Sequence, residues 1–126
     1  GAADLGAVGN VPRFTVTGEV EAESLVPFTV TTLVGVGATL ALGVTNATAL
    51  FIAATPAPNL TTGELWTEAT GAGTPESGIA IPAALKQIAL SSNIVGTVAV
   101  AAITAGVLRL SCRWRPISAN GLVVPA

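Results

Sequence analysis

The chain of 126 residues has no histidine, no tyrosine and no methionine, and its one cysteine is Cys112. Histidine is the commonest general base and metal ligand, so its absence removes the usual centre of acid–base or metal chemistry. A lone cysteine forms no internal disulfide, and a thiol buried in a strand is inert. No phosphate-binding glycine motif follows a predicted strand. We therefore expect no enzyme activity, no catalytic residue, no metal and no cofactor.

Charged residues are also scarce. They make up 10% of the chain, five basic against seven acidic, with a net charge of −2. Soluble proteins average about 25% charged residues, so these charges are too few to cover an ordinary monomer. Nucleic acid is an unsuitable partner, because binding it requires clustered cations that displace phosphate counterions. Since 51% of the residues are hydrophobic, a membrane or other protein subunits must cover much of the surface.

Two long segments carry no charge, one between Glu23 and Glu64 and one between Lys86 and Arg109. A transmembrane helix needs about 20 predominantly apolar residues. Glycine and threonine interrupt both segments, and their bulk comes from β-branched side chains that prefer strands. No basic cluster flanks them, and no basic residue precedes an apolar run near the N-terminus. We expect strands, with no membrane partner and no signal peptide.

Short strands joined by turns rich in glycine and proline predict an all-β sandwich or jelly-roll-like barrel. Residues 1–12 are expected to form a flexible arm, and 13–126 a single β domain. Segment 81–90 fits a helical turn or a strand equally well. The strands are expected at 13–24, 26–37, 38–45, 49–55 and 65–70, with a closing hairpin of 93–103 and 107–118.

The segment 108–118 alternates two kinds of side chain. Odd positions carry three of the five positive charges of the chain, at Arg109, Arg113 and Arg115. The even positions point to the other face of the strand and predict core residues: Leu108, Leu110, Cys112 and Trp114. The position of the second tryptophan, Trp66, is left open between the core and an interface.

Three acids, Glu19, Glu21 and Glu23, repeat the same spacing and predict a second charged row. A straight strand spreads such carboxylates about 7 Å apart, which suits a metal ion poorly. The two rows pair either between neighbouring strands of one sheet or between subunits, where complementary charges set the register. Arginines left without such a pair would instead bind an acidic protein surface.

Two parts of the chain resemble a known group of proteins. The features are Asn93-Ile94-Val95 opening a strand, the turn at 103–108, the closing residues 114–126, and a tryptophan after a polar loop in 63–70. They resemble small structural proteins of tailed bacteriophages, the head decoration or cement proteins. The resemblance implies a homo-oligomer, probably a trimer, bound to the major capsid protein on the outer surface of the virion. It brings no catalytic residues.

Other functions remain open from the residues alone. A tail, neck or fibre-base subunit suits the low charge and β-rich composition equally well. A small coat protein that packages RNA is disfavoured by the few basic residues. A carbohydrate-binding module is disfavoured by the two tryptophans and the lack of tyrosine, because sugars stack on aromatic rings.

Overall fold

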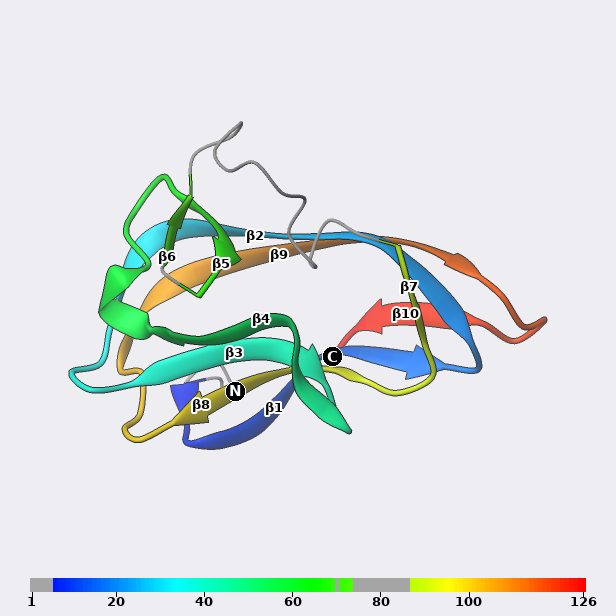
Figure 1. Ribbon diagram of the computed structural model, residues 1–126, viewed down its shortest axis with the longest axis horizontal. Coiled ribbons are helices and arrows are strands. Elements are labelled where there is room, and N and C mark those ends of the chain that lie inside the picture. Colours follow the sequence, from blue (N-terminus) through cyan, green and yellow to red (C-terminus); the bar gives the residue numbers. More distant parts are fainter. Residues whose placement is uncertain (1–5, 70, 74–86) are drawn as a thin grey trace.

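The computed structural model describes residues 6–69, 71–73 and 87–126, which form two antiparallel sheets packed face to face (Figure 1). The all-β sandwich predicted from the sequence is confirmed. The first sheet has the order β10-β1-β8-β3-β4. Its strands are β1 (Gly9–Thr17), β3 (Thr39–Val44), β4 (Ala47–Pro56), β8 (Ile94–Ala99) and β10 (Leu122–Pro125).

The second sheet is built around the long strand β2, which pairs with β9 along one edge. Strands β5 and β7 pair with the two halves of its other edge, and β6 pairs with β5. A 3-10 turn at Ala57–Asn59 follows β4. The strands of this sheet are β2 (Val20–Val34), β5 (Leu65–Glu68), β6 (Gly71–Gly73), β7 (Ile88–Leu90) and β9 (Ala105–Pro116).

The strand expected over 13–24 is two strands that belong to different sheets. Gly18 has a φ of 64°, a left-handed conformation that glycine adopts without steric cost. The chain turns there, and the carbonyl of Glu19 accepts hydrogen bonds from the N–H groups of Ile117 and Ser118. Alternation continues through this turn in the sequence, which is why the pattern alone reads as one strand. At its other end β1 begins at Gly9, so the last residues of the expected arm 1–12 are strand, while 1–5 lie outside the described residues.

The predicted closing hairpin is wrong. Strand β8 pairs with β1 and β3 in the first sheet, whereas β9 pairs with β2 in the second. The segment between them therefore crosses from one sheet to the other (Figure 1). Strands that are consecutive in the sequence and joined by a short connection usually pair. Here β8 is mostly buried and has a neighbour on each side, β1 and β3, so neither of its edges is available to β9.

The other expected strands correspond to observed ones. Segment 38–45 contains β3, 49–55 lies in β4, and 65–70 contains β5. The expected strand 26–37 matches the second half of β2 up to Val34, and its last three residues lie in the turn before β3. The end of the ambiguous segment 81–90 is strand β7, and its residues 81–86 lie outside the described part of the chain.

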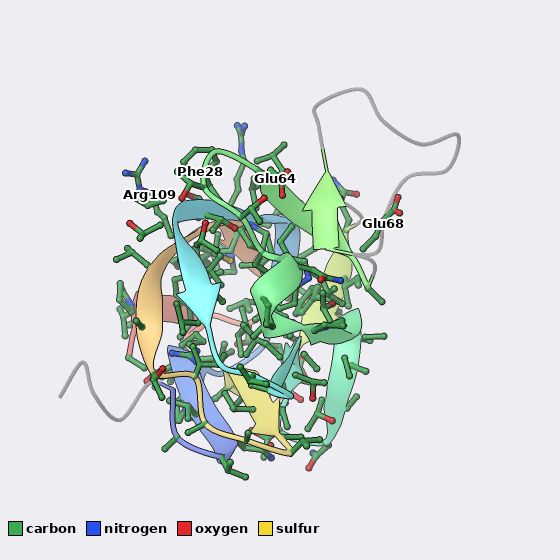
Figure 2. All side chains as sticks on the ribbon, turned by 90° about the vertical axis from the view of Figure 1, so that its left-hand side faces the viewer. Phe28, Glu64, Glu68 and Arg109 are labelled. Carbon is green, nitrogen blue, oxygen red and sulfur yellow. The ribbon has the colours of Figure 1, made fainter. Side chains whose placement is uncertain are left out.

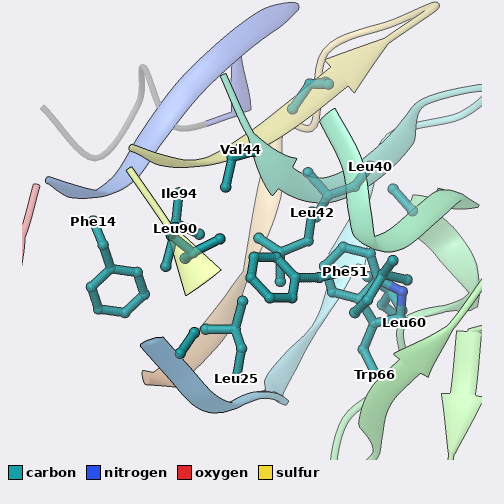
Figure 3. Close-up of a cluster of buried hydrophobic side chains, with 14 of the residues drawn as sticks. Phe14, Leu25, Leu40, Leu42, Val44, Phe51, Leu60, Trp66, Leu90 and Ile94 are labelled. Carbon is teal, nitrogen blue, oxygen red and sulfur yellow. The ribbon is translucent and has the colours of Figure 1, made fainter. Parts of the chain in front are cut away.

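A single hydrophobic core fills the space between the sheets (Figure 3). Trp66 is fully buried there, and its indole N–H donates to the hydroxyl of Thr55 at 3.0 Å. The position that the sequence left open is therefore in the core. Leu25 and Leu42 are also fully buried, with exposed fractions of 0% and 1%.

The inward face of β9 is less well covered. The four expected core residues, Leu108, Leu110, Cys112 and Trp114, alternate with exposed neighbours and pack against the core. All four are only partly buried, because β9 lies at the edge of its sheet and pairs with β2 alone among the described strands.

The two tryptophans provide a direct test of this difference in burial. Trp66→Ala should lower the free energy of unfolding by about 3–5 kcal/mol, because it removes a fully buried ring and leaves Thr55 without its donor. Trp114→Ala, the matched control, should cost about half as much, because part of that ring is exposed in the folded protein. Denaturant unfolding followed by circular dichroism measures both. Equal losses would contradict the described core.

Candidate interaction surface

The outward face of β2 and β9 carries a set of charges that we call the charged face: Glu21, Glu23, Arg109, Arg113 and Arg115. Its geometry follows from the register, which places Glu21 opposite Arg115 and Phe28 opposite Arg109. A bulge between Ala22 and Ser24 leaves Glu23 without a residue directly opposite it on β9, and its carboxylate lies beside Arg113.

Two ion pairs cross between the strands. Arg115 donates from Nε and Nη2 to the two carboxylate oxygens of Glu21, at 3.3 and 3.2 Å. These hydrogen bonds raise the pKa of the guanidinium above its usual range. Arg113 Nε lies 3.3 Å from Glu23 Oε2. The structure thus brings together two members of each predicted row within one sheet.

The remaining member of each row has a different environment. Glu19 lies in the turn between β1 and β2, so the prediction that it continues the row of β2 is wrong. The Arg109 guanidinium lies 6.0 Å from the centre of the Phe28 ring, at the limit of a cation–π contact (Figure 2). Arg109 forms no ion pair with any residue of the described ranges.

Chemically reactive groups are few on the described part of the chain. Burial raises the pKa of the Cys112 thiol, which lowers the thiolate fraction at a given pH and with it the reactivity of the sulfur. No group of three or more histidine, cysteine, aspartate or glutamate side chains gathers among residues 6–69, 71–73 and 87–126. None of the helical segments in those ranges is both long and apolar enough to cross a membrane.

One end of the sandwich is apolar, and we call it the apolar tip: Val8, Val34, Val36, Val100 and Val107. The side chains of Val36 and Val100 are 92% and 82% exposed. They lie in the β2–β3 and β8–β9 connections, which meet at the left end of Figure 1. The N–H of Thr104 donates to the carbonyl of Val34 at 2.7 Å and holds the two connections together.

Val100 holds a strained backbone conformation at this tip. Its φ is 70°, and the N–H of Ala101 donates to the carbonyl of Ala99 at 2.9 Å. This is a γ-turn with a left-handed central residue, which is rare and strained, and for a β-branched residue positive φ is an outlier. Such a conformation costs about 1–3 kcal/mol and concentrates at functional sites. The residue held in this unfavourable conformation is an exposed valine.

A cleft of about 500 Å³ opens beside the tip, between β1 and β9. Phe14, Leu108 and Leu110 line it together with the buried Leu33 and Leu40. Arg13 contributes to the wall, and burial lowers the pKa of its guanidinium. The volume lies in the range of about 300–1,000 Å³ that small-molecule pockets and apolar anchor sites occupy.

Comparison of the chain with protein-family models, with curated proteins and with solved structures finds no match. The arguments for function therefore rest on the residues themselves. Sequence reasoning missed the apolar tip, because exposed valines read like strand residues in a hydropathy pattern. The flanking glycines of Val36 and the run of small residues after Val100 were the available signals of two turns.

Reversing one charge tests how much the ion pairs stabilise the fold. Arg113→Glu should lower the free energy of unfolding by less than about 1 kcal/mol, because the Arg113 side chain is 81% exposed and solvent screens the pair. Adding Glu23→Arg should restore most of the loss. A loss of several kcal/mol, or no recovery in the double variant, would show that the pairing is different.

The reactivity of Cys112 tests its burial. Because the pKa of the thiol is raised in the folded protein, the thiolate fraction at a given pH is smaller than in the unfolded chain. Alkylation at pH 8 should be several-fold slower in native buffer than in denaturant, and its midpoint on the pH axis should be higher. Equal rates in the two states would place the thiol in open solvent.

Proposed function

We propose that the chain is a structural subunit of a virus particle. In this role it is a decoration protein that binds the outer capsid surface of a tailed bacteriophage as an oligomer and stabilises the shell. The proposal combines the resemblance at 63–70 and 84–126 with a surface suited to burial against other subunits. The oligomer, with a trimer as the first expectation, belongs to the proposal.

The apolar tip is the observation that carries this proposal. In a free monomer, both the exposed side chain and the strained backbone of Val100 raise the free energy of the folded state. A partner that covers the side chain would compensate for this by burying it. The five valines of the tip come from four separate segments of the chain, and the two connections carrying Val36 and Val100 are tied together by a hydrogen bond. A rigid apolar projection of this kind supports docking onto a preformed surface.

The low charge of the chain supports the same role. Only two ion pairs form between the described residues, and the arginine of each is exposed to solvent. A protein covered on one side by a capsid and on another by its own copies needs few charges to stay soluble. Binding then stabilises the shell by mass action, because the subunit has its highest affinity for the assembled lattice.

The test uses particles of the phage that encodes the chain, with and without this protein. Particles that lack it should release DNA at a lower temperature, and adding the purified protein back should restore resistance. The copy number should match sites on the capsid lattice. An unchanged release temperature would contradict the stabilising role, and a copy number matching a ring or tube of the tail would favour the tail-subunit alternative.

Two variants connect this experiment to the apolar tip. Val36→Asp and Val100→Asp should each weaken reattachment at least about tenfold, because they place a charge in a contact that must be dry. The matched control is Ile117→Asp, an exposed apolar residue in the β9–β10 turn at the opposite end of the sandwich (Figure 1). Equal weakening by all three variants would show that the tip has no special part.

A further inference from the structure

One edge of strand β9 has no neighbour among the described strands. The strand pairs with β2 along its length and with no other strand of the described residues. The edge of β1 nearest to it has no described strand beside Gly9–Pro12, because β10 pairs with β1 only from Phe14 to Thr17. Unpaired strand edges carry rows of backbone donors and acceptors and are templates for an added strand.

The apolar cleft lies between these two edges. Gly106, Leu108 and Leu110 of β9 line one wall, and Pro12 and Phe14 of β1 line the other. A strand added beside β9 would direct every second side chain inward, toward this cleft and the half-buried residues of β9. Apolar side chains fit those positions, because each would cover surface that is now partly exposed.

The outward positions of an added strand would meet Arg109, Arg113 and Arg115. Glu21 and Glu23 pair with two of these arginines from the β2 side, one strand further away. Even so, the side chains of Arg113 and Arg115 remain 81% and 63% exposed. Opposite charges on adjacent strands attract and like charges repel, so acidic residues fit the outward positions.

A second copy of this chain does not provide such a strand. Two β9 edges paired with each other would bring two rows of arginine together. The other strands with a free edge among the described residues, β4, β6, β7 and β10, contain no aspartate or glutamate. Among the described residues, no free-edge strand of a second copy supplies the acidic side chains, so we take the occupant to be a segment of another protein.

We propose that the β9 edge binds an extended segment of another protein in which apolar and acidic residues alternate. The segment adds to the second sheet as an antiparallel or parallel neighbour of β9. Its apolar side chains enter the cleft and its carboxylates pair with the arginine row. This inference rests on the proposed function for its context, because it states what kind of segment the shell offers to this subunit.

The test uses soluble peptides rather than capsids. A fluorescently labelled peptide of three valine–glutamate repeats should bind the purified full chain, measured by anisotropy. The matched peptide of valine–lysine repeats should bind at least about tenfold more weakly, because its cations would face the arginine row. Hydrogen exchange should show new protection of β9 amides and none at the edge strand β4.

Charge reversal sharpens the result. In the double variant Arg109→Glu with Arg113→Glu the preference should invert, so that the lysine peptide binds more tightly. The control variant Ala47→Glu with Ala49→Glu adds two carboxylates to the exposed edge of β4 and should keep the original preference. Circular dichroism checks that both variants are folded, and the two peptides on the unaltered chain test the proposal without any variant.

Three outcomes would overturn the inference: no binding of either peptide, binding without charge preference, or protection at another strand. Protection of β9 that grows with protein concentration alone would identify a second copy as the occupant and would also overturn it. Reattachment to capsids is a separate measurement. If reattachment succeeds while the glutamate peptide fails, the proposed function stands and the β9 inference falls.

Discussion

The long pairing between β2 and β9 is the interaction on which the rest of the structure depends. It joins segments about 80 residues apart in the chain, from Val20 opposite Pro116 to Val34 opposite Ala105. This ladder sets the register that brings Glu21 to Arg115. It also places the start of β9 next to the end of β2, which is where the apolar tip forms. Strand β2 has β9 on one edge and β5 and β7 on the other, whereas the outer edge of β9 has no neighbour among the described strands.

The sequence correctly predicted the class of fold and assigned the side chains of β9 to the correct faces of the strand. It did not predict which strands pair with each other. Side-chain alternation has a period of two in every strand, so it correctly separated Leu108 and Leu110 from the arginines. The same period cannot show which strand lies next to which. The alternation therefore led to two wrong predictions: a hairpin of β8 and β9, and a single strand that continues through the turn at Gly18.

The sequence also did not predict how deeply each side chain is buried. Trp66 and Trp114 are the same residue type and both lie in strands, yet Trp66 is fully buried and Trp114 is only partly buried. The difference follows from position in the sheet, since β5 lies between β6 and β2, whereas β9 pairs with β2 alone among the described strands. The strained turn at Val100 is likewise invisible in the sequence, because a valine gives no sign of a positive φ.

In the proposed function, one side of the molecule is covered by other proteins of the particle. The apolar tip, the cleft and the outer edge of β9 adjoin one another. We interpret this side of the molecule as the part that meets the shell. The most direct measurement is a cryo-EM map of the assembled particle. Our account predicts density for this chain on the outer capsid, with the apolar tip buried against the shell and a strand of the shell beside β9. A map that placed the tip and the β9 edge in open solvent would contradict it.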